Sequence, residues 1–195
     1  MKKGTNSIEA YNIILQKHID KKDIVKIYRT FNGEEANITG FVLAMSTDFL
    51  LLQPVTDFLM NDGYVIIRKD QLGNLRCNKY EHTQKKILKA EGLFSKAYGI
   101  NENIDLTNWQ TIFKDLKKHD HHVIVECEDK EEADFIIGPI KQITKNKVGI
   151  QYFSPTGQLE NGYTSINYAE ITTLKFNDHY STTFRKYLKP NAAAK

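Results

Sequence analysis

The sequence predicts a mostly β protein with flanking helices, an α+β fold of two tandem five-stranded antiparallel barrels, each preceded and followed by a helix. Three observations lead to this prediction. Short apolar runs separated by turn residues follow one another in each half of the chain. Apolar residues at helical spacing flank each set of runs. The pattern of the first half then returns in the second half, which indicates a duplication.

In the first half, Ile8, Tyr11, Leu15 and Ile19 recur at three- and four-residue steps and share one face of a predicted helix. Five strand-like runs follow, separated by turn residues such as Asn32-Gly33. The runs cover residues 24–28, 37–45, 49–52, 64–68 and 72–77. A second helix is predicted after them, with its apolar face at Tyr80, Ile87, Leu88 and Phe94.

The second half has the same order of elements. A leading helix is predicted from a shared apolar face, which consists of Leu106, Trp109, Ile112, Phe113 and Leu116. Strand-like runs follow over residues 122–125, 133–143, 148–153, 162–168 and 170–176. A helical tail carries Phe184, Tyr187 and Leu188. Five short strands in about 55 residues cannot form two full sheets, so each set is expected to curl into a small barrel with its own core.

The repeat keeps a constant separation between matched apolar and glycine positions. The separation is 98 for Val25 with Val123, Ile27 with Val125, Gly40 with Gly138, Val42 with Ile140, Met45 with Ile143, Leu50 with Val148 and Leu52 with Ile150. It is 99 for Gly63 with Gly162, Tyr64 with Tyr163, Ile67 with Ile166, Leu72 with Ile171 and Leu75 with Leu174. A period of about 100 residues is too long for a solenoid unit, so we predict duplicated domains at 1–104 and 105–190, with a tail at 191–195.

Composition narrows the class of protein. The net charge is only +3, from 27 basic and 24 acidic residues, whereas a dedicated nucleic-acid-binding protein usually carries a larger basic excess. Cys77 and Cys127 lie in apolar strand-like runs and are interpreted as buried thiols, which fits a reducing compartment. Polar residues follow Met1-Lys2-Lys3, and no apolar run approaches the ~18 residues of a membrane helix. We therefore expect a soluble cytoplasmic protein.

The segment Ile67-Arg68-Lys69-Asp70-Gln71-Leu72 resembles the second motif of the Sm-like (LSm-type) family of small β-barrels. Gly33 and Gly40 resemble glycines of the family's first motif, and the likeness covers residues 6–77 and 107–176. The second half is also similar in style to uncharacterised bacterial proteins, from which no activity can be transferred. The resemblance implies small bent barrels and, in RNA-binding members, a base pocket made by an asparagine and the arginine of the second motif.

The chain departs from that family's pattern at most of the pocket positions. Phe49 or Leu50 occupies the place of the asparagine, and Lys69 replaces the glycine that follows the arginine. The second half has no arginine in the matching segment, residues 166–171. Only Arg68 is carried over, so the resemblance implies at most a degenerate RNA site in the first half.

Two further groups of residues are weak candidates for binding. Lys114, Lys117 and Lys118 could join Arg68 and Lys69 in contacting nucleic acid, although such lysines are more often the solvated face of a helix. His119 and His121 have the residue type and spacing of metal ligands. Their place at the end of a helix is more typical of surface histidines near a helix C-terminus, so metal binding by them is not the favoured interpretation.

No arrangement of nucleophile and base, phosphate-binding glycine loop or paired cysteine motif is found, so no catalytic residue and no cofactor is predicted. We predict a non-catalytic binding or scaffold module that acts through protein partners or self-association, with no membrane partner. The alternative is an RNA- or DNA-binding regulator that uses a degenerate Sm-type site. An enzyme of unknown class ranks third.

Overall fold

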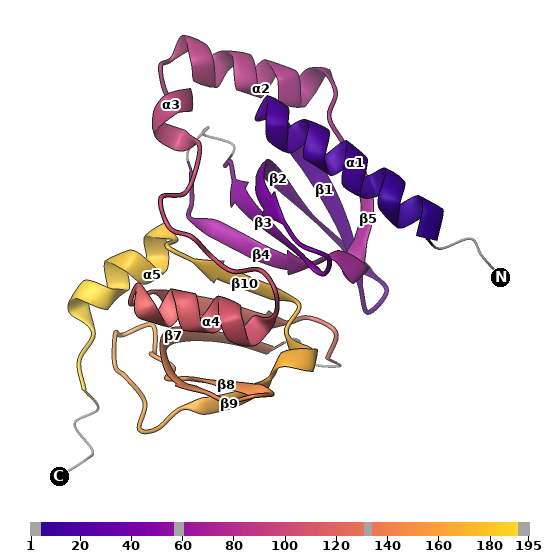
Figure 1. Cartoon of the computed structure of the whole chain (residues 1–195). Helices are drawn as coiled ribbons and strands as arrows, with labels where there is room; N and C mark the ends of the chain where they lie inside the picture. The colour runs from indigo at the N-terminus through magenta and orange to yellow at the C-terminus, as the bar shows by residue number, and fades with distance from the viewer. Residues whose placement is uncertain (1–4, 57–60, 131–133, 191–195) are drawn as a thin grey trace.

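The protein is described by a computed structural model that covers residues 5–56, 61–130 and 134–190. In these ranges, ten strands form one antiparallel sheet with the order β5-β1-β2-β3-β4-β10-β6-β7-β8-β9 (Figure 1). The first half supplies β1 (Ile24–Phe31), β2 (Glu34–Met45), β3 (Phe49–Pro54), β4 (Tyr64–Arg68) and β5 (Leu72–Arg76). The second half supplies β6 (His122–Cys127), β7 (Asp134–Ile143), β8 (Lys147–Ile150), β9 (Thr164–Asn167) and β10 (Thr173–Phe176).

Helices occur close to the positions that the sequence predicted for them (Figure 1). The predicted second helix is the exception, because it is divided into Lys79–Ala90 and Phe94–Ala97, and Tyr80 and Ile87 of its predicted apolar face are exposed. The α-helices are α1 (Thr5–Lys21), α2 (Lys79–Ala90), α3 (Phe94–Ala97), α4 (Trp109–Lys118) and α5 (His179–Phe184). The 3-10 turns are η1 (Lys69–Gln71), η2 (Tyr168–Glu170) and η3 (Arg185–Tyr187). Helix α1 packs on β2 and α2 on β1, whereas α4 packs on β7 and β8. In each half, the helix that precedes the strands in the sequence therefore packs on the sheet.

The predicted pair of tandem five-stranded barrels is wrong. Strand β4 of the first half pairs with β10 of the second, with Ile67 opposite Thr173 and Tyr64 opposite Phe176. A single open sheet therefore runs through both halves, and each half leaves one edge strand, β5 or β9, at an end of the sheet. The domain boundaries proposed at residues 104 and 105 stay a prediction.

The predicted separate core for each half is also wrong. Leu50 and Leu52 on β3 pack in a cluster with Leu15 of α1, on one face of the sheet. Their neighbours Phe49 and Leu51 belong instead to a cluster dominated by the second half. Because successive side chains of a strand point to opposite faces, an apolar run supplies both clusters at once. The apolar run of β3 was recognised in the sequence, but nothing local indicated that the second half would cover its other face.

Within each half the strands pair in the same register. The first and last strands pair Ile27 with Leu75 in one half and Val125 with Leu174 in the other. The second and third strands pair Val42 with Leu52 and Ile140 with Ile150, and an irregularity of register follows at the same place in both. The separations of 98 and 99 read from the sequence therefore recur in the pairing of the strands.

Two glycines at equivalent positions permit the close approach of neighbouring strands. A Cβ atom on Gly40 would lie 2.2 Å from the carbonyl oxygen of Gln53, and one on Gly138 would lie 1.9 Å from that of Gln151. Gly138 also has a φ of 152°, which side-chain-bearing residues rarely adopt. The strand glycines found by the repeat are thus required where the second strand of each half bends over the third.

Candidate binding surfaces at the junction and at the free edge

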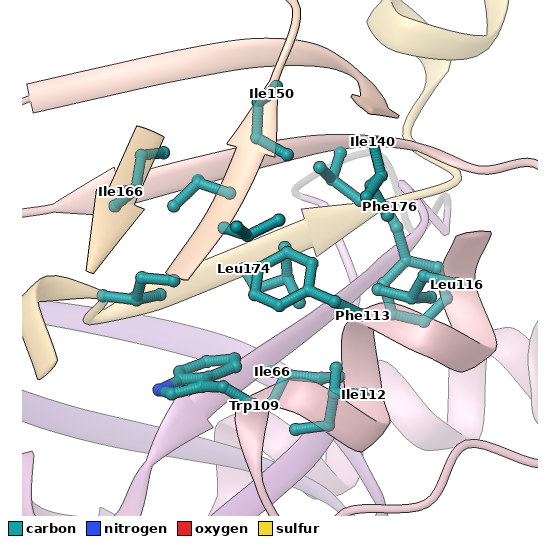
Figure 2. Close-up of a cluster of buried hydrophobic side chains, with 14 of the residues drawn as sticks. Ile66, Trp109, Ile112, Phe113, Leu116, Ile140, Ile150, Ile166, Leu174 and Phe176 are labelled. Atoms are coloured by element: carbon teal, nitrogen blue, oxygen red, sulfur yellow. The ribbon is translucent and has the colours of Figure 1, made fainter. Parts of the chain in front are cut away.

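The junction between the halves is a pairing of β4 with β10 that α4 covers. Trp109 of α4 meets the ring of Phe49 edge-on, with 4.7 Å between ring centroids. Ile112, one turn further along α4, is fully buried in the same cluster as Ile66 of β4, and Figure 2 shows Trp109 and Ile112 beside Ile66. The junction therefore combines a strand pairing with apolar contacts from the helix above it.

A cavity of about 790 Å³ opens beside this junction, between η1 of the first half and η2 of the second. Arg68 and Lys69, two of the residues singled out by sequence, line it together with Asp48, Trp109 and Tyr168. Aromatic walls with charged groups at the rim are suited to a ligand in general. What the cavity can bind depends on whether its charges are available.

The two cations of the cavity are already bonded within the protein. The Arg68 guanidinium donates through Nε to Asp70 at 3.0 Å, forms a second, shorter contact with the same carboxylate, and donates to the carbonyl oxygen of Ala169. Lys69 Nζ donates to Asn12 Oδ1 at 2.6 Å and to the carbonyl oxygen of Ser46 at 2.9 Å. Burial also lowers the pKa of Lys69. Phosphate binding at this place would have to displace these partners.

The predicted lysines of α4 do not join this cavity. Lys114, Lys117 and Lys118 are exposed, and none of them lines the cavity. Lys117 Nζ donates to the carbonyl oxygen of Lys141 at 2.6 Å. The five residues proposed for nucleic-acid contact are therefore split between the cavity and the exposed side of α4.

His119 and His121 do not gather a set of metal ligands. His121 Nε2 lies 2.5 Å from Glu102 Oε2, whereas His119 is exposed and its ring centroid lies 6.3 Å from that of His121. Within the described part of the chain, the group of three or more ligand-type side chains that lie together is elsewhere, in the first half.

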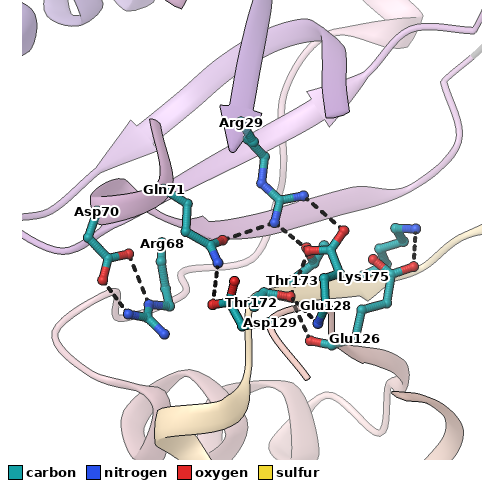
Figure 3. Close-up of polar contacts among 10 residues, drawn as sticks. All are labelled: Arg29, Arg68, Asp70, Gln71, Glu126, Glu128, Asp129, Thr172, Thr173 and Lys175. Atoms are coloured by element: carbon teal, nitrogen blue, oxygen red, sulfur yellow. Dashed lines mark hydrogen bonds and ion pairs between the residues drawn. The ribbon is translucent and has the colours of Figure 1, made fainter. Parts of the chain in front are cut away.

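A buried polar network joins the two halves through Gln71, the last residue of η1, which does not line the cavity (Figure 3). Arg29 of β1 donates to Glu128, which follows β6, and to Gln71 Oε1 at 3.0 Å. Thr172 and Thr173 donate their hydroxyl groups to the same Glu128 carboxylate at 2.6 and 2.9 Å. This network was missed in the sequence, where the one signal was a charged residue, Arg29, at the end of an apolar strand.

The two ends of the sheet differ in their chemistry. At the β5 end, α1 places Ile13 and Ile14 in solvent, with 67% and 46% of their surface exposed. By the repeat separation of 98, Ile14 is the equivalent of Ile112 at the junction. At the β9 end, Ser165 is exposed where the equivalent residue of β4 is the buried Ile66. The helix above β5 therefore exposes apolar side chains that the equivalent helix α4 buries at the junction. The exposed face of β9, at the other end of the sheet, is polar.

Equivalent ends of α1 and α4 support this comparison of the two helices. Lys22 after α1 and Asp120 after α4 both have positive φ, 51° and 57°. Their amide groups donate to the carbonyl oxygens of Ile19 and Lys117, which are also 98 residues apart. Both helices therefore end in the same way at the same point of the repeat, and residues along them can be matched one to one.

Comparison of the chain with protein-family profiles, curated proteins and solved structures found no match. The Sm-like resemblance therefore stays a prediction made from the residues quoted above. Among the described residues, no helix has the length and apolar character needed to span a membrane.

Proposed function

We propose that this protein is a non-catalytic binding module that takes up a β-strand of a protein partner along the free edge of β5, beneath the exposed face of α1. The observation that carries this proposal is the junction inside the molecule. There β10, the repeat equivalent of β5, pairs with β4 of the other half. Ile112 of α4 is buried in the same cluster as Ile66 of β4. In the first half, the described strands leave the outer edge of β5 without a neighbour, and Ile14 is left in solvent.

The internal junction also defines the register expected for the partner strand. Thr173 lies opposite Ile67 and Lys175 lies opposite Val65 across the junction. By the repeat separation of 99, Asn74 and Arg76 of β5 are the equivalents of Thr173 and Lys175 of β10. A partner strand is therefore expected to lie opposite Asn74 and Arg76 as β4 lies opposite Thr173 and Lys175. The Leu75 amide now donates to Asn74 Oδ1 at 2.8 Å, and a bound strand would replace this local bond with a bond between strands. The partner would form an antiparallel pair with β5.

The surface chemistry favours a different protein over a second copy as the occupant. A partner strand must place an apolar side chain under Ile14, as β4 places Ile66 under Ile112. The free strand β9 of a second copy would bring Ser165 to that position, and Gly149 would take the place of Leu51 beside it. A strand rich in β-branched residues, like the Val65-Ile66-Ile67 segment of β4, fits the surface. The proposed partner is therefore a protein with an accessible apolar strand.

The proposal can be tested with peptides taken from the chain itself. A peptide with the sequence of residues 63–69, which contains β4, should bind the full-length protein and shift the amide NMR signals of β5. The matched peptide of residues 162–168, which contains β9, should bind far more weakly, because it lacks the apolar residue at the Ile66 position. The variant Ile14→Asp should abolish binding of the first peptide, whereas Ile87→Asp, on the exposed side of α2, should leave binding unchanged.

Two results would overturn the proposal. The first is no binding of the 63–69 peptide, or binding that is equal in the wild type and in Ile14→Asp. The second is equal binding of the 162–168 peptide together with concentration-dependent oligomers in sedimentation velocity, which would point to self-association through β9. The nucleic-acid-binding alternative named from the sequence has no comparable observation in its favour, since Arg68 and Lys69 are already bonded to other groups. The enzyme alternative stays a prediction.

A further inference from the structure

Three ligand-type side chains from distant parts of the first half converge at the end of α1. They are His18 of α1, Asp23 in the connection to β1, and Cys77, which follows β5. One ligand atom from each lies within 4.8 Å of the others. His18 and Cys77 are partly exposed, whereas Asp23 is buried, with 8% of its surface exposed. His18 Nδ1 lies 3.0 Å from Asp23 Oδ2. An ion could therefore reach this cluster from solvent with small side-chain movements.

A fourth ligand-type residue stands next to this cluster. His82 of α2 is exposed, and its Nε2 atom lies 3.7 Å from Cys77 Sγ. Ligand atoms at the corners of a tetrahedron around Zn²⁺, at bond lengths of about 2.0–2.3 Å, are roughly 3–4 Å apart. The pairs His18–Asp23 and Cys77–His82 already have this spacing. A thiolate, an imidazole and a carboxylate are each groups that bind Zn²⁺ in proteins.

Groups around the cluster hold one of the ligands in place. Lys85 Nζ donates to Asp23 Oδ1 at 2.7 Å and to the carbonyl oxygen of Lys21 at 2.7 Å. Because Lys85 bonds Oδ1, the other oxygen, Oδ2, remains directed toward His18 and is available for an ion. Outer hydrogen bonds of this kind orient metal-binding carboxylates in known sites. The bound ion would replace the His18–Asp23 hydrogen bond and leave the Lys85 contact intact.

The internal repeat shows what these positions do when they carry no ligands. By the separations of 98 and 99, the equivalents of His18, Asp23 and Cys77 in the second half are Leu116, His121 and Phe176. Leu116 and Phe176 are fully buried, and the rings of His121 and Phe176 have centroids 5.2 Å apart. The fold thus brings these three positions together in both halves. In the second half, Leu116 and Phe176 make apolar contacts at this place. In the first half, ligand-type side chains occupy the equivalent positions.

We propose that His18, Asp23, Cys77 and His82 bind one Zn²⁺ ion, which ties the end of α1 to the connection between β5 and α2. Binding releases the thiol proton of Cys77 to solvent, and the thiolate and carboxylate together balance the charge of the ion. The ion would link the two elements, α1 and β5, that form the free edge described above. This inference does not depend on the proposed partner, because it rests on a different set of residues.

Cobalt substitution in the full-length protein tests the site. After treatment with a chelator, the chain should bind one Co²⁺ with a thiolate-to-metal charge-transfer band and the visible bands of tetrahedral cobalt, and Zn²⁺ should displace it. Cys77→Ser should remove the charge-transfer band and weaken Zn²⁺ binding by at least about 100-fold, a larger loss than outer-group mutations cause. His18→Gln and His82→Gln should each weaken Zn²⁺ binding by at least about 10-fold.

Matched controls separate this site from other binding. Cys127→Ala, at the second cysteine, and His119→Gln, at an exposed histidine, should keep the spectrum and the affinity of the wild type. Zn²⁺ should raise the melting temperature of the wild type and not that of Cys77→Ser, since only a site formed in the folded state stabilises it. Circular dichroism of the metal-free variants checks their folding, and the Zn²⁺ affinity of the exposed-site variant His82→Gln provides a second test if Cys77→Ser does not fold. Absence of the charge-transfer band in the wild type, or unchanged Zn²⁺ affinity in Cys77→Ser, His18→Gln or His82→Gln, would overturn the four-residue site.

Discussion

Arg29 Nη2 of the first half lies 2.5 Å from Glu128 Oε2 of the second half, and this ion pair bridges the junction of the sheet. The Arg29 side chain is 3% exposed and that of Glu128 is 17% exposed. Burial alone would raise the pKa of Glu128, but hydrogen bonds from Arg29 and Thr172 outweigh it, and the pKa lies below its ordinary value. The carboxylate therefore stays charged at neutral pH, as its partners require.

Removing one member of this pair is expected to be costly. Glu128→Gln leaves the Arg29 charge buried without its counter-ion, which should lower the free energy of unfolding at pH 7 by about 3–5 kcal/mol, measured by urea denaturation. Asp70→Asn is the matched control, because it breaks the more exposed pair with Arg68 and should cost under about 1 kcal/mol. Equal, small losses in the two variants would show that the buried pair contributes little.

The lowered pKa of Glu128 also predicts how stability depends on pH. Since the folded-state pKa lies below the unfolded value of about 4.3, the contribution is fully present above that value and is lost as pH falls through the folded pKa. The difference in free energy of unfolding between the wild type and Glu128→Gln should therefore shrink below about pH 4. A difference that stays constant down to pH 3 would contradict this assignment.

His122 at the start of β6 should destabilise the protein in mild acid. Burial, with the nearby Arg185 charge, lowers the pKa of His122 to about 4. Between that value and the unfolded value of about 6.5, the unfolded chain binds a proton that the folded chain does not, so stability falls as pH decreases, by up to about 1.4 kcal/mol per pH unit. His122→Gln should remove this slope in denaturation curves between pH 7 and pH 5. The control His119→Gln, at an exposed position, should retain it.

The shared core predicts that the two halves unfold together. Ile66→Ala should cost about 2–5 kcal/mol, because Ile66 is fully buried against the α4 cluster of the other half. Leu52→Ala and Ile150→Ala should cost a similar amount, since both side chains are at most 1% exposed. Tryptophan fluorescence, which reports Trp109 at the junction, and circular dichroism should give one coincident transition in each variant. Separate transitions would mean that the halves are independently stable.

Nucleic acid is expected to bind weakly and without sequence preference. The net charge is only +3, and both cations of the junction cavity are bonded to other groups. Fluorescence anisotropy with a U-rich single strand at ~150 mM salt should show no specific complex. Any residual binding should decline steeply with salt and should depend on the exposed Lys114, Lys117 and Lys118. A dissociation constant well below micromolar that is lost in Arg68→Ala would instead support the nucleic-acid-binding alternative.

Several features could be predicted because they depend on local patterns. The face of α4 that carries Trp109, Ile112 and Phe113 followed from helical spacing, and all three side chains are buried. The candidate site was predicted less completely. Arg68 and Lys69 do line a cavity, but their bonds to Asp70 and Asn12 were not visible in the sequence. These partners come from separate elements or depend on the conformation of a turn.

The sequence by itself determined where the strands and helices lie and that they repeat. Periodic apolar residues and turn residues are local signals, and the constant separation between matched residues is found by comparing the chain with itself. Only the tertiary structure decided that β4 pairs with β10, that Arg29 meets Glu128, and that His18, Asp23 and Cys77 converge. The physical reason is that different strand edges, and different apolar faces, have the same local sequence pattern, so the pattern does not identify their partners. Which edge pairs with which is decided by the burial of both faces of a strand such as β4, and that burial exists only when the whole chain is folded.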